Sequence, residues 1–419
     1  MCNDGGVFWT NTAPENLRIM SMGEWDEQRC QEFYEEGLEI TSFLDEGGIT
    51  WKSKSEAVDF AEGFGPAFYQ AALSSFSRSN AKILYSTPAK DLIVNPDTAE
   101  VIGVYAEQDG KRIAVKATQA VILATGSYCA NEELVKQLNM GGAMNYYSTG
   151  SPYLQGDGLK MACSVGAALA NLWRGLEPDY PVCKEASDEL GFGVSLARPE
   201  HYSHPSYIYV NKQGKRFWCE STFMTHWKGD TYGQVSYTNY AYPNSPSYLV
   251  FDQACFEAQS VGNTLWEYGY ANLAGDEAYI WSADNSVELE KGWIKTASTL
   301  EELAEIIGID AEGLVAEVDR YNGFCEAKFD EDFGREDYVP LGEGPYYAIE
   351  QGVAIIYSIG GVRSDAQSRV LNWDGKPIPR LYSAGNIGQG VYVIPIGLQG
   401  CWVEGRRAAR DAVKLDAWN

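Results

Sequence analysis

The fold of this chain is indicated most directly by the stretch Ala120-Val121-Ile122-Leu123-Ala124-Thr125-Gly126. Five apolar residues in succession, without polar alternation, are typical of a parallel β-strand that is covered on both faces. In doubly wound α/β sheets, ligands bind beyond the carboxyl ends of the strands, where small residues let backbone amides approach a phosphate or a ribose. We therefore predict a covered strand over 120–124 that ends at a ligand site.

A second strand of this kind is predicted far downstream, from Arg380 to Ala384, and it stops at Gly385-Asn386. Between the two strands lies Gly156-Asp157-Gly158, which begins a helical run. Asp157 can cap that helix, and the small residues allow it to pack closely on a sheet. Each segment alone also has a simpler interpretation, either a tight turn after a buried strand or a capped packing helix.

The segments before residue 120 predict helices followed by a meander of strands. Apolar residues at helical spacing cover 14–45 in two pieces, and another helix is expected over 65–79. An Asp109-Gly110 turn is expected to join two of the strands. The expected strands are 83–85, 91–94, 101–106 and 112–117.

The composition disfavours several classes of protein. The length of 419 residues allows about two to three domains at roughly 150 residues each. The 32 Lys and Arg against 58 Asp and Glu give a net charge of −26, which repels nucleic acid and anionic membrane surfaces. No apolar run reaches the ~18 residues that cross a bilayer, and the first six residues do not form a signal peptide. A cytoplasmic protein is expected, with an export signal further upstream as the open alternative.

The cysteines and histidines do not form a disulfide or metal pattern. Nine scattered cysteines, an odd number without a CxxC pair, indicate reduced thiols. The only histidines are His201, His204 and His226, which makes a histidine-based metal site a poor expectation. We predict no metal.

Four motifs in a fixed order resemble one family. They are Val121-Ile122-Leu123-Ala124-Thr125-Gly126, Gly156-Asp157-Gly158-Leu159-Lys160-Met161-Ala162, Val210-Asn211-Lys212-Gln213-Gly214-Lys215-Arg216-Phe217 and Leu381-Tyr382-Ser383-Ala384-Gly385-Asn386. The set is similar to that of FAD-dependent flavoproteins, a family that includes fumarate reductase flavoprotein subunits, urocanate reductases and 3-ketosteroid dehydrogenases. The likeness spans about residues 7 to 415 and is specific for the family rather than for a substrate.

The resemblance implies an α/β fold with a glutathione-reductase-like FAD-binding domain and an inserted α+β capping domain. The FAD-binding domain would cover 1–179 and 350–419, and the capping domain would cover 180–349. The cofactor implied is FAD, and the capping domain would close a small-molecule substrate over the flavin.

The first element of the family is not found in this sequence. That element is a strand, a GxGxxG turn and a helix whose N-terminal amides bind the FAD pyrophosphate. Gly63-Phe64-Gly65, Gly191-Phe192-Gly193 and Gly342-Glu343-Gly344 all lack the third glycine and a preceding strand. Three explanations stay open: an N-terminal truncation, which we rank first, a separate chain that supplies the motif, or a loss of FAD binding.

The resemblance implies a cofactor site at the strand ends and at the start of the last helix. Gly126 and Asp157 would line the adenosine and phosphate side of FAD, and Asn386 stands where fumarate reductases have Glu. The helix that begins near residue 398 would direct amides with partial positive charge at the reduced flavin, the alternative being a simple small-residue helix start. The implied cofactor-binding residues are Ala124, Thr125, Gly126, Asp157, Gly385, Asn386, Gln399, Gly400 and Cys401.

Residues that bind a dicarboxylate in fumarate reductases are replaced in this chain. The family's proton-donating Arg matches Met224, its binding His matches Tyr357, and its later Arg falls in Pro395-Ile396-Gly397. A dicarboxylate would leave its charges unpaired in a partly dry site, which costs several kcal/mol per ion. The resemblance therefore disfavours fumarate as the substrate.

Two tyrosines are the candidate catalytic residues. Tyr392, in Tyr392-Val393-Ile394-Pro395, is similar to the Tyr-x-x-Pro of the ketosteroid branch, where the tyrosine polarises the substrate carbonyl or assists proton removal. The match departs after the proline, where Ile396 precedes Gly397. Tyr357 is the second candidate. Because the chain contains 27 tyrosines, a packed tyrosine with a bonded hydroxyl is the alternative for both.

We expect hydride transfer between FAD and a carbon–carbon bond next to a carbonyl, in a neutral hydrophobic substrate. One alternative is an enoate reductase for a monocarboxylate or an aryl acid. An alternative of another class is a non-catalytic fragment or a subunit that needs a partner chain to bind FAD. The redox partner is not indicated by the sequence.

Two groups of charged residues have structural interpretations. Arg216 and Glu220 are expected to form an ion pair near a hairpin turned at Gln213-Gly214. The acidic run Asp330-Glu331-Asp332, with Glu336-Asp337, is expected to be a solvated face.

Overall fold

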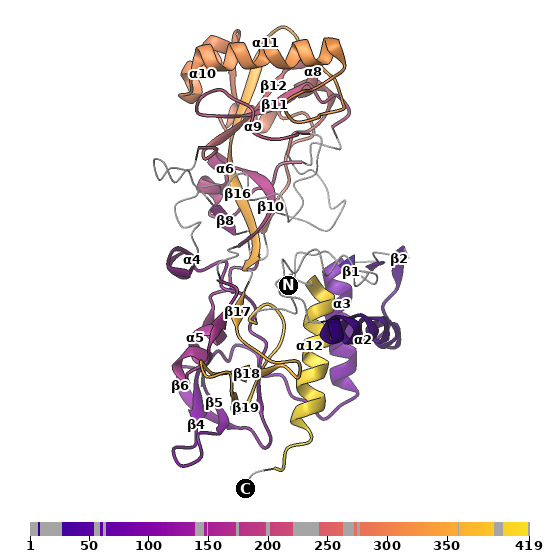
Figure 1. Ribbon diagram of the computed structural model, residues 1–419, viewed down its shortest axis with the longest axis vertical. Helices are drawn as coiled ribbons and strands as arrows, with labels where there is room; N and C mark the ends of the chain where they lie inside the picture. Colours follow the sequence, from indigo (N-terminus) through magenta and orange to yellow (C-terminus); the bar gives the residue numbers. More distant parts are fainter. Residues whose placement is uncertain are drawn as a thin grey trace. The chain divides into compact units, whose positions relative to one another are not determined.

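The computed structural model divides the chain into two compact units (Figure 1). Unit 1 comprises Met1–Met140, Pro152–Leu176 and Tyr357–Asn419, and unit 2 comprises Gly141–Ser151 and Glu177–Ile356. The assignment of FAD binding and capping to such units stays a prediction. The described residues are 7–8, 27–53, 59–61, 64–138, 146–148, 150–172, 176–197, 202–220, 243–262, 272–274, 277–358, 360–388 and 397–417.

Unit 1 contains a pair of parallel strands at the positions predicted for the two strand ends. β7 (Val121–Leu123) and β19 (Pro377–Ser383) are adjacent and parallel, with Leu123 opposite Ser383. β18 (Arg369–Leu371) pairs with β19 in the antiparallel sense, so the sheet order is β18-β19-β7. Helices accompany these strands in the same unit, which gives the mixed α/β architecture expected from the sequence.

The prediction that residues 120–124 form a strand covered on both faces is wrong. Among the described strands, β7 has a neighbour on one side only. Leu123 is buried, whereas 39% of the surface of Ile122 is exposed and Ala124 is exposed as well. Ile122 and Ala124 alternate with Leu123 and so share the face that is left exposed. An unbroken apolar run reports residue type but not whether a second layer packs on each face.

A three-stranded meander lies between α3 and β7 in the sequence of unit 1. β4 (Ala89–Val94), β5 (Val101–Gln108) and β6 (Lys111–Lys116) pair antiparallel in that order, which confirms three of the predicted strands. The fourth prediction is wrong, because 83–85 does not form a strand and the side chain of Tyr85 is 64% exposed.

The helices of unit 1 agree with the sequence where they are described. α2 (Glu27–Glu46) and α3 (Phe64–Ser77) confirm the helical patterns over 27–45 and 65–77, and residues 14–26 lie outside the described ranges. The further helices are α4 (Glu132–Leu138), α5 (Asp157–Ser164) and α12 (Gly397–Ala412). Two small sheets consist of β1 (Val7–Phe8), β3 (Asp59–Ala61) and β2 (Trp51–Ser53), and of β9 (Leu169–Ala170) and β17 (Gly361–Val362).

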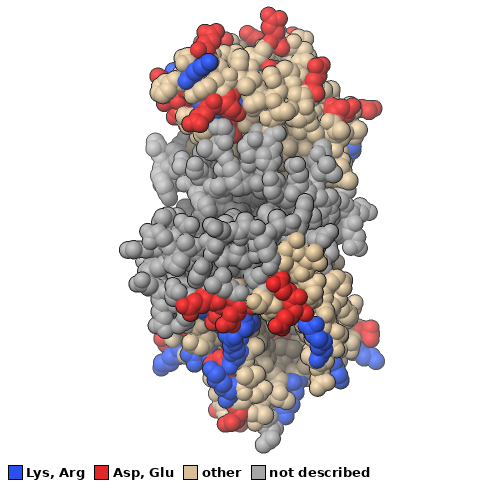
Figure 2. All heavy atoms as spheres, turned by 90° about the vertical axis from the view of Figure 1, so that its right-hand side faces the viewer, with Lys and Arg blue, Asp and Glu red and all other residues tan. Residues whose placement is uncertain are grey.

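Ion pairs join α12 to α2 in unit 1. Arg406 Nη2 lies 3.0 Å from Glu39 Oε2, and Arg407 Nε lies 3.2 Å from Glu36 Oε1. A hydrogen bond from Arg410 and the charge of Arg406 lower the pKa of Glu39. Figure 2 shows basic and acidic side chains next to one another on the described surface of this unit.

Unit 2 is built on a sheet around its longest strand, β16 (Tyr346–Ser358). β16 pairs with β10 (Leu176–Cys183) and β12 (Ser247–Asp252), and β12 pairs with β11 (Tyr207–Asn211). β8 (Tyr146–Ser148) and β15 (Lys295–Ala297) also pair with β16. The smaller elements are α6 (Lys184–Leu190), α8 (Gln253–Ala258), α9 (Ser286–Glu290), β13 (Asn272–Ala274) and β14 (Glu277–Tyr279).

Two capped helices form the core of unit 2 with β11 and β12. The Thr299 side chain accepts a hydrogen bond at the start of α10 (Leu300–Ile307), and Asp310 does so at the start of α11 (Ala311–Ala327). Each fully buried Leu or Val contributes roughly 1.5–3 kcal/mol relative to an exposed one. The buried cluster includes Ile208, Val210, Val250, Leu303, Leu314 and Val318.

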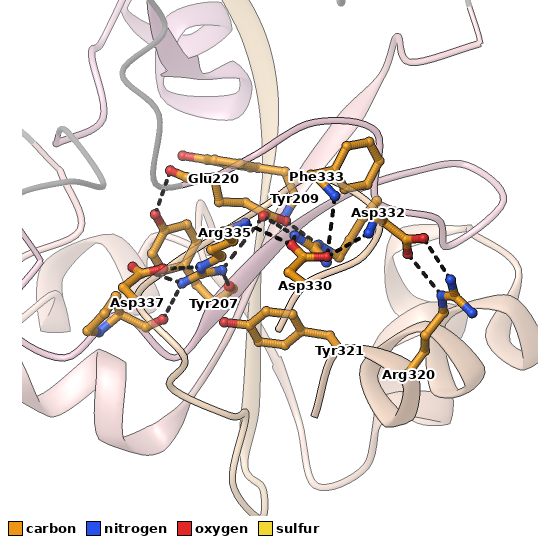
Figure 3. Close-up of polar contacts among 12 residues, drawn as sticks. Tyr207, Tyr209, Glu220, Arg320, Tyr321, Asp330, Asp332, Phe333, Arg335 and Asp337 are labelled. Atoms are coloured by element: carbon orange, nitrogen blue, oxygen red, sulfur yellow. Dashed lines mark hydrogen bonds and ion pairs between the residues drawn. The ribbon is translucent and has the colours of Figure 1, made fainter. Parts of the chain in front are cut away.

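A buried ion-pair network occupies unit 2 (Figure 3). Arg216 Nε lies 2.7 Å from Glu220 Oε1, and Arg216 Nη2 lies 2.9 Å from Asp330 Oδ2. The predicted Arg216–Glu220 pair is confirmed. The prediction of a solvated face is wrong for Asp330, which is buried, and for Asp337, which is half-buried beside Arg335. Glu331, Asp332 and Glu336 are exposed as expected. Burial opposes ionisation of Asp330, but Arg216 outweighs it and holds its pKa below the usual value.

Arg335 extends the same network and is fully buried. It donates from Nη1 to the Tyr207 carbonyl oxygen at 2.5 Å and from Nη2 to the Pro205 carbonyl oxygen at 2.6 Å. Its Nε lies 2.5 Å from Asp337 Oδ1. Figure 3 shows these groups converging from β11 and from the segment after α11. The side chain therefore ties the loop after α11 to the backbone of β11.

The described helices and cysteines have two further properties. None of the helices in these ranges is long and apolar enough to span a membrane. Burial raises the pKa of the Cys183 and Cys255 thiols, which disfavours the reactive thiolate form. Among the described residues, Cys163, Cys183, Cys255 and Cys325 are free thiols.

Candidate functional site

The two strand ends singled out in the sequence leave the same edge of one sheet. The amide of Ala384 donates to the carbonyl oxygen of Leu123 at 2.9 Å, so the parallel pairing continues to the last residues of both strands. Gly126 and Gly385 then adopt the left-handed backbone conformation, with φ values of 73° and 75°. Glycine suits both positions because a side chain would be strained there.

The glycine-rich start of α5 packs against both strand ends. A Cβ atom on Gly158 would lie 2.1 Å from Thr125 Oγ1 and 2.6 Å from Ile387 Cδ1, so the side chains of Thr125 and Ile387 would have to move. Gly158 is therefore the position that lets the helix approach the two loops. The three motifs, which are more than 200 residues apart at their extremes, meet at one place in unit 1.

Asp157 has a different place from the one expected. The residue that precedes the helix is Gly156, with a φ of 73° and no side-chain cap, and Asp157 is the first residue of α5. An acidic side chain in the first turn still interacts favourably with the helix dipole. The prediction that Asp157 caps the helix is wrong, because the left-handed Gly156 takes the capping position.

The end of β7 presents backbone donors to the surface. Ala124 and Thr125 are exposed and Gly126 is half-buried. Within the described part of the chain, the amides of Thr125 and Gly126 donate no backbone hydrogen bond. Amides of this kind at a strand end can bind the oxygen atoms of a phosphate or a ribose.

The first two turns of α12 hold the end of β19. The Gly385 amide donates to Glu404 Oε2 at 2.8 Å, and a Cβ atom on Gly385 would lie 3.0 Å from Cys401 Sγ. Gly400 is buried and Cys401 is half-buried. Of the implied cofactor residues, Gln399 lies in α12 and only its backbone is described.

Sequence reasoning missed Ser383, the last residue of β19. Its hydroxyl is buried and has no hydrogen-bond partner within the described residues. Tyr382 donates to Asp411 Oδ2 of α12 at 3.0 Å, so the next residue along the strand faces away from that helix. In the sequence, the only indication of this hydroxyl was a serine near the end of a mainly apolar strand.

These groups fit a long polar ligand that is held mainly by neutral donors. The end of β7 supplies amides without a backbone acceptor in the described structure, and Gly158 allows close approach of backbone segments. Ser383 supplies a buried hydroxyl whose hydrogen-bonding capacity is unused among the described residues. Buried hydroxyls are normally hydrogen-bonded, so this one is suited to a ligand oxygen or nitrogen. The ribose, pyrophosphate and carbonyl groups of a dinucleotide offer such atoms.

The side chains of the two candidate catalytic tyrosines lie outside the described part of the structure. Tyr357 lies in β16, where its backbone but not its side chain is described. Tyr392, Met224 and the Pro395-Ile396 dipeptide lie outside the described residues. The roles of the two tyrosines stay predictions.

Comparisons with known proteins indicate the family of this chain. Residues 4–393 match the family model described as an FAD binding domain. NADH:acrylate oxidoreductase of Vibrio harveyi is 29% identical over 335 residues, which cover 78% of this chain and 30% of that protein. 3-Oxosteroid 1-dehydrogenase of Mycolicibacterium smegmatis is 28% identical over 354 residues, which cover 78% of this chain and 57% of that protein. The chain thus matches less than two thirds of the length of either relative.

A solved structure has the same mixed α/β fold. The crystal structure of 3-ketosteroid delta1-dehydrogenase from Sterolibacterium denitrificans, in complex with 1,4-androstadiene-3,17-dione, superposes with a TM-score of 0.80. The two chains are 18% identical, and the superposition covers 99% of this chain and 92% of that one. Together with the match over 4–393, these findings show that this chain belongs to the FAD binding domain family.

Proposed function

We propose that this protein is an FAD-dependent oxidoreductase that transfers a hydride between the flavin and a carbon–carbon bond next to a carbonyl group. The observation that carries the proposal is the meeting of three motifs in unit 1, where the parallel ends of β7 and β19 contact Gly158 of α5. Unit 1 would be a glutathione-reductase-like FAD-binding domain, and unit 2 would be the capping domain.

The residues of this chain would hold FAD and orient the substrate. The amides of Thr125 and Gly126 and the hydroxyl of Ser383 would bind polar groups of the cofactor, while the N-terminal amides of α12 favour negative charge nearby. FAD, when bound, supplies the hydride acceptor or donor. The hydroxyl of Tyr392, or of Tyr357 in a different pose, would donate a hydrogen bond to the substrate carbonyl oxygen and hold the proton that moves there.

The proposed substrate is neutral and hydrophobic, similar to a ketosteroid. The positions that bind a dicarboxylate in fumarate reductases hold Met224, Tyr357 and Pro395-Ile396-Gly397, and none of these is a basic residue. The 3-oxosteroid 1-dehydrogenase relative supports this choice. An enoate reductase for a monocarboxylate or aryl acid is the second candidate, and the NADH:acrylate oxidoreductase relative favours it.

The first experiment is the visible absorbance spectrum of the purified chain after incubation with FAD and desalting. Retained flavin bands are expected. The Gly158→Val variant should be colourless, because its side chain would collide with Thr125 and Ile387. Gly405→Ala is the matched control, since a Cβ atom there meets nothing within 4 Å, and it should keep the flavin. Equal flavin content in parent and Gly158→Val would contradict the site.

The substrate class is tested by the reoxidation of reduced flavin. Reoxidation by a 1,4-diene-3-ketosteroid but not by acrylate or cinnamate supports the first candidate, and the reverse supports the second. Tyr392→Phe should lower turnover by about 10²–10⁴-fold if its hydroxyl assists proton transfer. Unchanged turnover in this variant would remove Tyr392 from the mechanism.

A candidate function of another class is a subunit that binds FAD only with a partner chain. It is favoured by the open edge of β7, where Ile122 is 39% exposed and the described strands provide a neighbour on one side only. This candidate predicts a colourless chain that gains flavin bands when a polypeptide with a strand, a GxGxxG turn and a helix is added. Full flavin retention by the chain alone would exclude it.

A further inference from the structure

Glu404 is a buried carboxylate on α12, with 5% of its surface exposed. Its Oε2 atom accepts the hydrogen bond from the Gly385 amide at 2.8 Å, and its carbonyl oxygen accepts one from Ser368 Oγ at 3.2 Å. Burying a charged group costs free energy unless it is hydrogen-bonded. The contact with Gly385 accounts for part of that compensation, and it places the carboxylate directly at the end of β19.

The turn that Glu404 contacts is held from two other sides as well. The Gly388 amide donates to the Gly385 carbonyl oxygen at 2.9 Å, which closes the turn on itself. The Val362 amide donates to the Ile387 carbonyl oxygen at 2.9 Å and joins the turn to β17. α12 contributes Glu404 as a hydrogen-bond acceptor to this turn. Because Glu404 follows Cys401 by three residues, the two side chains lie on the same side of the helix.

We propose that Glu404 is a positioning residue that fixes the Gly385-Asn386 turn in the geometry that binds FAD. The inference rests on the proposed function. A hydrogen bond to a charged acceptor is stronger than one between neutral groups and is directional. Without it, the Gly385 amide would lose its acceptor in a left-handed conformation, and the loop beside the cofactor would have no bond to α12 at this point.

The test compares the parent with two Glu404 variants and one control variant, all in the chain of 419 residues. Glu404→Leu removes the acceptor at similar volume, and we expect FAD affinity to fall roughly ten- to a hundredfold, as for the loss of a hydrogen bond to a charged group. Glu404→Gln keeps an acceptor oxygen and should restore affinity to within a fewfold of the parent. FAD affinity is measured by quenching of flavin fluorescence, and the stability of the FAD-free chain by thermal unfolding.

Tyr382→Phe is the matched control. It removes the hydrogen bond to Asp411 Oδ2, which also joins β19 to α12 but lies outside the Gly385-Asn386 turn. This variant should be less stable than the parent but should bind FAD with unchanged affinity. If Glu404→Leu loses stability to the same extent as Tyr382→Phe and still binds FAD like the parent, Glu404 is merely structural and the proposal is overturned.

Hydrogen exchange of the Gly385 amide tests the contact without FAD. Exchange should be slow in the parent and in Glu404→Gln and faster in Glu404→Leu, and equal protection in all three would overturn the positioning role. If Glu404→Leu does not fold, Glu404→Asp replaces it, because the shorter side chain keeps the charge but should not reach Gly385. A parent chain that binds no FAD would contradict the proposed function, whereas the exchange result would still decide the contact itself.

Discussion

We expect the buried hydroxyl of Ser383 to affect both the stability of the chain and its capacity to bind a ligand. It is buried and, among the described residues, has no hydrogen-bond partner. An unsatisfied buried polar group costs about 1–3 kcal/mol relative to a satisfied one. Such a cost in the FAD-free chain is consistent with a group kept for a ligand.

Ser383→Ala should therefore have opposite effects on stability and on binding. Without FAD, the free energy of unfolding should rise by about 1 kcal/mol, because the unsatisfied hydroxyl is removed. With FAD, affinity should fall several-fold. Thermal unfolding with and without FAD measures both quantities. A loss of stability in the FAD-free variant would show that the hydroxyl already has a partner, and would contradict its assignment to the cofactor.

Two carboxylates in unit 2 predict a dependence of stability on pH. Burial raises the pKa of both Glu185 and Glu350, and the charge of Glu350 raises that of Glu185 further. The Lys295 Nζ atom, 3.8 Å from Glu185 Oε1, partly opposes the shift. A carboxyl group with a raised pKa in the folded state releases its proton at higher pH than it does in the unfolded chain, so stability is lost as the pH rises through this interval.

Glu350→Gln should remove this penalty. The variant should be more stable than the parent at pH 8, and the difference should shrink as the pH falls toward the usual glutamate value of 4.5. Denaturant unfolding between pH 5 and pH 8 is the measurement. Glu326→Gln, at an exposed position of α11, is the control and should show no such pH-dependent gain. A gain that grows toward low pH would contradict the assignment.

At the scale of elements, the network around Arg335 fixes the segment after α11 to β11. Removing one member of a buried ion pair leaves the other charges without compensation, which costs about 3–5 kcal/mol. Arg335 also serves two carbonyl oxygens, those of Pro205 and Tyr207, so its loss would leave both acceptors unmatched. The sequence indicated the Arg216–Glu220 pair through its short spacing, but Arg335 is over 100 residues away, and pairing over that distance is set by the fold.

Arg335→Met should thus destabilise unit 2 by about 3–5 kcal/mol. Arg320→Met is the matched control, because Arg320 pairs with Asp332 at an exposed site, where ion pairs contribute about 0–1 kcal/mol. Urea unfolding of the full chain, followed by tryptophan fluorescence, measures both. Similar losses in the two variants would contradict the role given to burial.

The distance in sequence between interacting residues explains which features could be predicted. The meander was predictable because hairpin strands are neighbours in sequence, and the ends of β7 and β19 were predictable from their glycines. The position of β7 at a sheet edge was not, because the number of sheet neighbours does not leave a periodic signal. Ser383 and Glu404 were missed because their hydrogen-bonded neighbours lie 15 to 36 positions away in the sequence.

At the scale of the whole molecule, the net charge of −26 opposes compaction through mutual repulsion. Figure 2 shows acidic side chains spread over the described surface of unit 2 around α10 and α11. Salt screens such repulsion over about 8–10 Å at physiological ionic strength. We expect this repulsion to outweigh the exposed ion pairs, because each of these contributes little.

The melting temperature of the chain should rise when sodium chloride is increased from 10 to about 300 mM, a range over which the screening length falls several-fold. Differential scanning fluorimetry measures this shift. A parallel series with choline chloride separates screening from binding of a particular cation, and the two salts should act alike. A melting temperature that falls with salt would mean that attractive ion pairs outweigh the net repulsion.

The edge of β7 that has no neighbour among the described strands has a consequence for the behaviour of this protein in concentrated solution. An apolar strand with unused backbone donors and acceptors is a template onto which the same strand of another copy can add. Mutual repulsion between copies keeps these edges apart at neutral pH. As acid protonates the carboxylates, the net charge and the repulsion between copies decrease. We then expect self-association to begin at β7 before the chain unfolds.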